Sequence, residues 1–361
     1  MFENTKALLD KFLEIGIPGY EIIVHKEGER VLHLMGGVSN LGKGTPIKGG
    51  ETYYQYSCSK FVTSVAAMML FERGLLDIDS PLDRYMPEFS EMTVGREENN
   101  RPANRKITVE DLFTMSAGFD YDTKADYVER FRRETDGKCP TALFGKYIAQ
   151  KPLLFEPGEK FNYSFCHDVL AALVERISGE RYSDFVKKNI FDPLGMTRST
   201  FDPTSPLRSE VCQLYRYSEE EGKAIPTDEM IYILGDEYES GGAGLISNAE
   251  DLSLFVEGVR AYKLIRPETV DLMCRDLIAD RRGGFWIPNY SYGLGVRVPM
   301  KNGAEMGIYD FGWSGAAGSY LSVDIRNGIT VSYTQHLLSS PRVDLKRALV
   351  KTVTDDILDG R

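Results

Sequence analysis

The most restrictive feature of the sequence is a helical segment without a polar face. Residues 61–74 read FVTSVAAMMLFERG, a run that is apolar nearly all round and closes at Gly74. Such a helix has to be buried inside a protein, because a surface helix keeps one polar side. The polar stretch YSCSK at positions 56–60 immediately precedes it. The sequence therefore places small hydroxyl groups and a lysine at the entrance to a central, buried helix.

The chain is long enough to bury such a helix. It has 361 residues, of which 42% are hydrophobic and 27% charged, which predicts one large domain or two intergrown ones. A formal net charge of -11 without a Lys/Arg cluster argues against nucleic acid or an anionic membrane as a partner. The N-terminal MFENTKALLDKFLEIG predicts a short amphipathic helix, and no segment reaches the roughly 18 apolar residues of a membrane span. We expect a small-molecule substrate, with the oligomeric state left open.

Cysteine and histidine usage excludes several common kinds of site. The five scattered cysteines lack a CxxC pair, which indicates free thiols and a cytoplasmic protein, with a secreted mature form as the alternative. The four histidines lack an HExxH pattern, so neither a metal nor another cofactor is expected. The absence of a G-x-S-x-G elbow counts against an α/β-hydrolase. The glycines of SGGAGLIS are expected to let the backbone pass close to a cleft wall.

Strand signals lie at the two ends of the chain and are scarce between them. The predicted strands are 20–25, 30–37, 292–298, 318–325 and 328–335. Helical patterns and long loops fill the middle, and a last helix ends the chain. We predict an α/β (α+β) fold in which residues 1–75 and 236–361 form an antiparallel sheet flanked by helices. Residues 76–235 would form a mostly helical inserted domain, with the active site in the cleft between the two parts.

Ser57 and Lys60 form the first candidate catalytic pair. They stand three residues apart, so both side chains lie on one helix face. Free backbone N–H groups and the positive end of the helix dipole favour negative charge near Ser57. A lysine in a partly dry site has a lowered pKa and can act as a base on a neighbouring hydroxyl. Alone the S-x-x-K pattern is weak, and an N-cap serine followed by a surface lysine is the alternative.

Two later segments complete a recognisable order. Tyr163 and Ser164 stand just before a predicted helix, and the triplet WSG at 313–315 stands at the start of a predicted strand. With S-x-x-K at 57–60, this order resembles the serine β-lactamase and penicillin-binding protein superfamily. The closer likeness is to the class C β-lactamase-like branch, which includes esterases, D-amino-acid-specific peptidases and acyltransferases. Phrases such as ITVEDLFTMSAGF, FDPLGMTRSTF and SGGAGLISNAEDLSLF extend the resemblance over nearly the whole chain. It implies a β-lactamase-like fold.

The resemblance also implies catalytic roles for individual residues. Ser57 matches the nucleophile, and Lys60 matches the partner that helps to deprotonate it. Tyr163 matches the tyrosine of the second motif, a general acid/base that also protonates the leaving group. The backbone N–H groups of Ser57 and Ala316 would form the oxyanion hole.

Two departures from the family pattern bear on the substrate. Phe165 stands where the second motif usually has asparagine, and an apolar ring cannot donate that hydrogen bond. Trp313 replaces the lysine or histidine of the third motif, which continues with Ser314 and Gly315. These four residues are the candidate substrate-binding residues. Both changes weaken the case for β-lactam hydrolysis and favour an uncharged, partly apolar acyl ester or amide.

Several other residues have a competing explanation. Cys166 is better explained as a small buried residue at a helix start than as a nucleophile. His167 and Asp168 are neighbours in sequence and cannot both serve in a Ser-His-Asp relay. The aromatic segment 283–293 is either core packing or a wall of the substrate pocket, and segment 119–137 is either a lid or a solvated charged helix.

The sequence predicts a metal-independent serine hydrolase that forms an acyl-enzyme on Ser57. The favoured activity is an esterase on small or medium uncharged acyl esters, with water as the default acceptor. Alternatives within enzymes are a β-lactamase, a D-amino-acid peptidase or amidase, and an acyltransferase. The alternative outside enzymes is a catalytically silent ligand-binding relative.

Overall fold

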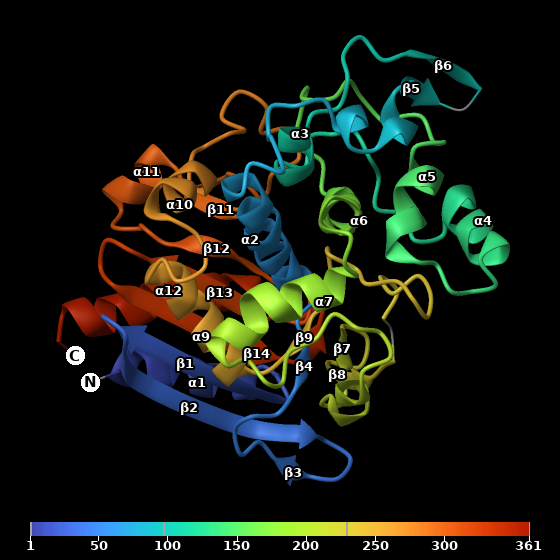
Figure 1. The fold of residues 1–361 in the computed structure, drawn as a ribbon. Helices are drawn as coiled ribbons and strands as arrows, with labels where there is room; N and C mark the ends of the chain where they lie inside the picture. Colours follow the sequence, from blue (N-terminus) through green and yellow to red (C-terminus); the bar gives the residue numbers. More distant parts are fainter. Residues whose placement is uncertain (1, 97, 229, 361) are drawn as a thin grey trace.

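Helix α2 (Ser59–Glu72) crosses the centre of the molecule, between a β-sheet and a group of helices (Figure 1). The computed structural model describes the chain except residues 1, 97, 229 and 361 and the side chains of residues 346 and 347. Every side chain of α2 from Ser59 to Leu70 is buried, as a helix without a polar face requires. The segment that the sequence marks as most restrictive is therefore the centre of the main hydrophobic core.

The main sheet has eight strands that pair antiparallel throughout. Their spatial order is β10 (Tyr290–Tyr292), β11 (Arg297–Pro299), β12 (Phe311–Ser314), β13 (Tyr320–Asp324), β14 (Ile329–Gln335), β1 (Gly19–Lys26), β2 (Glu29–Asn40) and β3 (Thr45–Pro46). The smaller pairings are β15 (Leu337–Leu338) with β7 (Tyr215–Ser218) and β8 (Lys223–Pro226), β4 (Tyr53–Tyr54) with β9 (Ile246–Ser247), and β5 (Thr93–Arg96) with β6 (Asn99–Pro102).

Helices cover both faces of the sheet and form the second part of the molecule. The α-helices besides α2 are α1 (Glu3–Glu14), α3 (Val109–Phe113), α4 (Asp126–Glu134), α5 (Phe144–Ile148), α6 (Cys166–Ser178), α7 (Tyr182–Val186), α8 (Asp192–Leu194), α9 (Ala249–Arg260), α10 (Pro267–Met273), α11 (Lys301–Glu305) and α12 (Val343–Leu358). Shorter helical turns are η1 (Tyr56–Cys58), η2 (Leu82–Arg84), η3 (Pro87–Phe89), η4 (Thr141–Leu143), η5 (Lys187–Phe191) and η6 (Pro206–Glu210).

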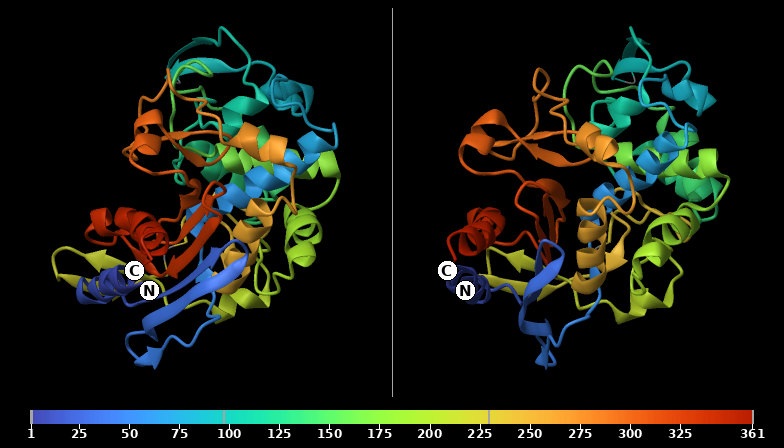
Figure 2. Two further views of the ribbon diagram at one scale, coloured as in Figure 1. Left: turned by 90° about the vertical axis from the view of Figure 1, so that its left-hand side faces the viewer. Right: turned by 60° about the vertical axis from the view of Figure 1, so that its left-hand side comes forward.

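Strands β1 and β14 form the buried middle of the sheet. Helices α1 and α12 lie side by side on one face, and α9 packs on the other (Figure 2). The two termini are joined where Thr5 donates hydrogen bonds from its backbone N–H and its hydroxyl to the Asp356 carboxylate, at 2.8 and 2.7 Å. Because both faces are covered, every residue of β14 and every residue of β1 before Lys26 is buried, although the sequence of β14, ITVSYTQ, alternates between apolar and polar residues.

The helical part packs against α2 through α6, which ends at Gly179 in the left-handed conformation. This region contains two hairpins that the sequence analysis did not predict, β5–β6 and β7–β8. The second hairpin forms a separate three-stranded sheet with β15, in which Leu337 pairs with Tyr215 of β7. The division of the chain at residues 75 and 235 stays a prediction.

The predicted antiparallel sheet, its covering helices and the mostly helical middle are confirmed as a β-lactamase-like fold. One strand was misplaced. Trp313 and Ser314 close β12 instead of opening a strand, and β13 begins only at Tyr320. The glycines around β12 interrupt the apolar alternation from which a strand is recognised.

Candidate active site

Ser57 lies in η1, a short 3₁₀ turn that leads directly into α2. The preceding Tyr56 has φ 45°, a left-handed conformation that is unfavourable for a large side chain. Ser59 stabilises this turn, because its hydroxyl donates to the Tyr56 carbonyl at 2.5 Å and accepts from the Leu245 N–H at 3.0 Å. Ser59 is fully buried whereas Ser57 is partly exposed. The two serines thus have separate roles, and only Ser57 is open to a substrate.

Lys60 points from the first turn of α2 back toward Ser57, with 3.3 Å between its Nζ and the Ser57 Oγ. Its Nζ also donates to the Gly242 carbonyl at 2.7 Å and contacts the Tyr121 hydroxyl at 3.3 Å. The side chain is fully buried, and this burial lowers the pKa of Lys60 to about 7, against the raising effect of the Asp168 carboxylate. A substantial share of Lys60 is therefore a neutral amine near pH 7.

Tyr163 meets this pair from the loop before α6. Its ring lies 4.5 Å from the Lys60 Nζ, and its hydroxyl is hydrogen-bonded with Ser57 and accepts from the Trp313 Nε1 at 3.2 Å. Burial raises the pKa of Tyr163 above its ordinary value, although both hydrogen bonds act to lower it. Tyr163 therefore stays a phenol at neutral pH, whereas part of Lys60 is a neutral amine.

Tyr121 is a member of the site that the sequence analysis missed. Its ring packs edge-on against Phe165 and stacks on Tyr232, at centroid distances of 4.7 and 4.9 Å. The contact between its hydroxyl and Lys60 joins residues 61 positions apart, so no local sequence pattern could indicate it. The segment 119–137 contributes this tyrosine to the site, and its helix α4 packs Tyr127, Val128 and Phe131 inward rather than forming a lid.

Asp168 lies behind Lys60, fully buried at the start of α6. The Ser240 hydroxyl donates to its Oδ1 at 2.6 Å, and burial raises the pKa of this carboxyl group. A Cβ at Gly242 would stand 2.4 Å from the Asp168 Oδ2, so only glycine lets this backbone pass between the carboxylate and Lys60. The predicted close approach of the SGGAGLIS backbone is thus observed, at the carbonyl that accepts from Lys60.

The loop after β12 brings Ala316 to the exposed side of the site. The Gly315 N–H is occupied, because it donates to the Ser319 carbonyl at 2.8 Å. A Cβ at Gly315 would lie 2.3 Å from the Gln55 carbonyl oxygen, so the loop contacts the turn before Ser57 directly. Among the hydrogen bonds of turns and loops in the described residues, the N–H groups of Ser57 and Ala316 have no backbone carbonyl as acceptor.

Phe165 does not reach the substrate side of the site. Its side chain is fully buried and contacts Tyr121 and Phe144 edge-on. The sequence placed it in the substrate pocket because it occupies the asparagine position of the motif. The start of α6 instead turns its ring into the core, where it supports Tyr121.

The cysteines next to the motifs and the pair His167 and Asp168 make contacts that belong to the packing of the core. Cys58 and Cys166 are fully buried, and burial raises the pKa of each thiol to about 12, which removes the thiolate a nucleophile needs. His167 contacts the Ser64 hydroxyl at 3.1 Å from its Nε2, whereas Asp168 contacts Ser240. The two neighbours thus point to different parts of the core.

Trp286 borders the site on its open side. Its ring is 49% exposed and lies edge-on to Tyr163 and Trp313, at centroid distances of 5.3 and 6.2 Å. The Phe161 N–H donates to the Arg281 carbonyl at 2.8 Å, which ties the segment that carries Trp286 to the loop that carries Tyr163. This geometry favours a pocket wall over simple core packing for segment 283–293.

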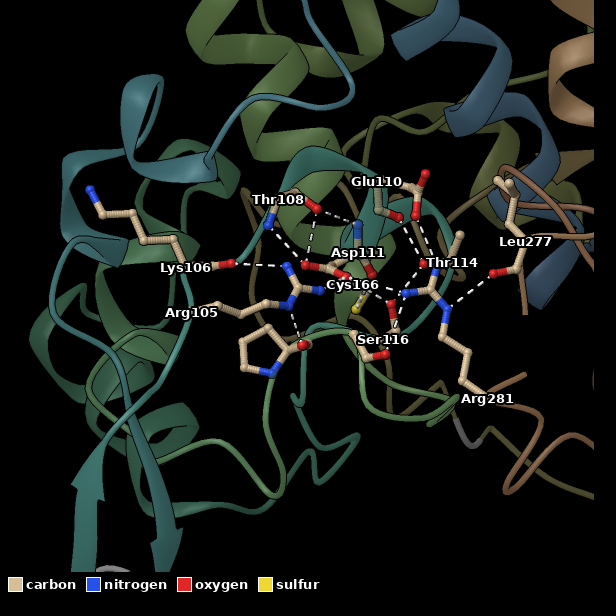
Figure 3. A network of polar contacts seen from close by, with 12 residues as sticks. Arg105, Lys106, Thr108, Glu110, Asp111, Thr114, Ser116, Cys166, Leu277 and Arg281 are labelled. Carbon is tan, nitrogen blue, oxygen red and sulfur yellow. Dashed lines mark hydrogen bonds and ion pairs between the residues drawn. The ribbon is translucent and has the colours of Figure 1, made fainter. Parts of the chain in front are cut away.

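A polar network anchors that segment to the helical part. Figure 3 shows Arg105 and Arg281 approaching Asp111 from two sides. Arg105 donates to the Asp111 Oδ1 at 2.7 Å, and Arg281 donates to the Glu110 Oε1 at 2.8 Å while its Nη1 lies 3.9 Å from Asp111. The buried Asp111 carboxylate also closes a capping box with Thr108 at the start of α3. The network therefore holds the segment that carries Trp286 against the loop that carries Tyr163.

In the described part of the chain, no three His, Cys, Asp or Glu side chains gather as metal ligands would. Nor does any helix in that part combine the length and apolarity that crossing a bilayer demands.

The chain is similar to several known proteins. The esterase EstB of Burkholderia gladioli is 27% identical over 353 residues, which cover 90% of this chain and 88% of that protein. The structure of simvastatin synthase LovD from Aspergillus terreus (the LovD6 mutant) matches with a TM-score of 0.81 at 22% identity, over 99% of this chain and 97% of the other. EstCE1, described as a hydrolase with promiscuous acyltransferase activity, has a TM-score of 0.77 at 21% identity, over 96% and 97%.

A family model described as Beta-lactamase matches residues 5–354, nearly the whole chain. Together with the esterase and acyltransferase relatives, this match identifies an enzyme of the serine hydrolase kind. The β-lactamase-like hydrolase character predicted from the sequence is confirmed by the same family match and the esterase relative. The chain belongs to the Beta-lactamase family.

Proposed function

We propose that the protein is an esterase that forms an acyl-enzyme on Ser57 and acts on uncharged acyl esters. The observation that carries this proposal is the contact of a partly exposed Ser57 hydroxyl with a fully buried lysine whose pKa is lowered to about 7. A base with a pKa near the working pH combines a large neutral fraction with a useful affinity for the proton.

The three contacts of Lys60 fit a neutral amine. Such a group has two hydrogens and one lone pair. The Gly242 carbonyl can only accept and takes one hydrogen, and the Tyr121 oxygen can take the other. The lone pair is left for the Ser57 hydroxyl. Lys60 would then remove the Ser57 proton as the oxygen attacks the ester carbonyl.

Tyr163 would serve the second proton transfer. It remains a phenol because burial raises its pKa, and its oxygen already contacts Ser57. Its proton would go to the leaving alkoxide, and the tyrosinate left behind would be stabilised by the Trp313 N–H and recover a proton from Lys60. The N–H groups of Ser57 and Ala316 would bind the oxyanion. Water would release the acyl group by the reverse sequence of proton transfers.

Transfer of the acyl group to an alcohol is the second candidate. It uses the same acyl-enzyme, and the similarity to EstCE1, described as a hydrolase with promiscuous acyltransferase activity, favours it. Adding a simple alcohol to the assay separates the two, because transesterification yields a new ester in place of free acid.

The test is intact-mass labelling with a fluorophosphonate, together with rates on p-nitrophenyl esters, nitrocefin and D-alanyl amides. We expect labelling and ester turnover in the wild type, loss of both in Ser57→Ala, and labelling preserved in the neighbouring control Ser59→Ala. Labelling that persists in Ser57→Ala would exclude the acyl-enzyme, and turnover of nitrocefin faster than of esters would exclude the preference for esters.

A further inference from the structure

A small cavity lies next to the reacting groups. The cavity has a volume of about 110 Å³, and its lining includes Trp286, Ile287, Ser314, Gly315, Tyr320 and Val343. Ser314 ends β12 and Gly315 directly precedes Ala316, whereas Trp286 contacts Tyr163. The cavity therefore adjoins the residues proposed for catalysis and lies between segment 286–287 and the start of α12.

A larger groove continues from this cavity. It has a volume of about 360 Å³, and its lining includes Ile287, Met306, Ile308, Tyr320, Ala348 and Val350. Ile287 and Tyr320 line both spaces, so the groove and the cavity adjoin at these two side chains. One wall of the groove is helix α12, and the other is the stretch between β10 and β12.

The charged side chains that line the groove have polar partners within the protein. Asp310 is buried and receives hydrogen bonds from Arg297, from Tyr290 at 2.5 Å and from Ser322 at 2.8 Å. Asp324 receives hydrogen bonds from Asn327 at 2.9 and 2.7 Å, and on α12 Lys351 pairs with Asp355 at 2.8 Å. An apolar ligand would leave these interactions intact.

Exposed apolar side chains mark the same surface. Trp286, Met306 and Val343 are 49%, 54% and 47% exposed, respectively. Each lines one of the two cavities. Large exposed apolar side chains that cluster at a groove indicate a binding surface, whereas apolar side chains scattered singly over a surface are normal.

We propose that the cavity and the groove bind an apolar chain of the ester, so that the enzyme prefers esters carrying a medium or long alkyl chain over short ones. This inference rests on the proposed esterase function of Ser57. At about 30 Å³ for each heavy atom, the smaller cavity holds about four atoms and the groove about twelve more. The bound alkyl chain belongs either to the acyl part or to the alcohol part of the ester. In both cases its methylene groups contact the same walls of the cavity and the groove.

The expected signature is a dependence of rate on chain length. Each methylene buried contributes ~0.8 kcal/mol, or about fourfold in kcat/KM, until the groove is filled. Two ester series separate the acyl and alcohol sides: ethyl esters from acetate to tetradecanoate, and acetates of ethanol to tetradecanol. We expect kcat/KM to rise steeply along one series. A flat profile in both series, with Ser57-dependent hydrolysis of ethyl acetate intact, would overturn the groove while leaving the esterase function in place.

Filling the groove gives a second test. Ala348→Phe places a ring in the groove from the wall formed by α12. It should lower kcat/KM for the ten-carbon substrate at least tenfold relative to kcat/KM for ethyl acetate. The matched control is Leu358→Phe, which adds a ring at the exposed far end of the same helix. Equal profiles for wild type and Ala348→Phe would contradict the proposal.

Tryptophan fluorescence measures binding without turnover. The chain has two tryptophans, and Trp313 is 2% exposed whereas Trp286 is 49% exposed. In Ser57→Ala, decyl acetate or ethyl decanoate should cover Trp286 and shift the emission to the blue, and Trp286→Phe should abolish the shift. A shift no larger than that with ethyl acetate would overturn the groove. Because this readout needs no catalysis, it stays decisive even if Ser57 proves not to be the nucleophile.

Discussion

The indole of Trp313 donates a hydrogen bond of 3.2 Å to the phenol oxygen of Tyr163, and the two rings stack with centroids 6.0 Å apart and 22° between their planes. The tryptophan that replaces the charged residue of the third motif thus still supplies a donor. It lies 150 positions from Tyr163 in sequence and stabilises negative charge on the phenol oxygen without adding a cation. This arrangement supports the proposal that the substrate is an uncharged ester.

Trp313→Phe should separate this hydrogen bond from the packing of the ring. The variant keeps an aromatic side chain but removes the N–H that lowers the pKa of Tyr163. A hydrogen bond to a developing charge is worth about 1.5–3 kcal/mol, so kcat should fall about 10- to 100-fold with little change in KM. The control is Tyr292→Phe, which removes an unpaired hydroxyl from the same aromatic cluster. An equal loss in both variants would assign the effect to packing.

The activity should depend on pH through Lys60. Its pKa is lowered from 10.5 to about 7, so the amine is protonated below pH 7 and free above it. We expect kcat/KM to fall tenfold per pH unit below about pH 7 and to stay level up to about pH 10, because Tyr163 ionises only above its ordinary range. A profile without an acidic limb near pH 7 would contradict the role of Lys60 as the base.

Asp168→Asn should move that acidic limb to lower pH. The Asp168 carboxylate raises the pKa of Lys60, so its removal makes the amine easier to deprotonate. The asparagine side chain can still accept from Ser240. The exposed Asp184→Asn is the control for a change in net charge alone, and its profile should match that of the wild type. A limb that stays in place or moves to higher pH in Asp168→Asn would show that this carboxylate does not set the pKa of Lys60.

Ser59→Ala should affect stability more than chemistry. The substitution leaves the Leu245 N–H without its acceptor in a fully buried place, whereas the Tyr56 carbonyl keeps its hydrogen bond from the Ser59 backbone N–H. An unsatisfied buried group costs about 1–3 kcal/mol, so the denaturant midpoint should fall while the slope m stays constant. Fluorophosphonate labelling of the folded variant should persist. Loss of labelling at full stability would reverse the roles of Ser57 and Ser59.

Gly315→Ala should disable the oxyanion site while the protein still folds. The new Cβ would lie 2.3 Å from the Gln55 carbonyl oxygen, so the loop that carries Ala316 has to move. Loss of one oxyanion donor lowers kcat about 100- to 1000-fold. Gly42→Ala is the control, because its Cβ meets nothing closer than 3.4 Å and should leave kcat unchanged. Wild-type activity in Gly315→Ala would remove Ala316 from the proposed oxyanion hole.

The sequence predicted the elements whose physical cause is local. The apolar run of α2 required burial, and the paired apolar strands at the chain ends required a covered antiparallel sheet. It failed at the hairpin β7–β8 and at the strand β12, whose glycines and polar residues hide the strand pattern. The pairing of Leu337 with Tyr215 could not be predicted either, because it joins segments more than one hundred residues apart.

For the site, the sequence by itself determined the pair Ser57 and Lys60, because a spacing of three residues places both on one face of a helix. Only the tertiary structure decided what surrounds them. Burial, which comes from the packing of the whole core, lowers the pKa of Lys60. Tyr121 and Gly242 reach the same amine from 61 and 182 positions away, and the start of α6 turns Phe165 into the core. Helical spacing is a property of consecutive residues, whereas desolvation and convergence depend on which distant segments the fold brings together.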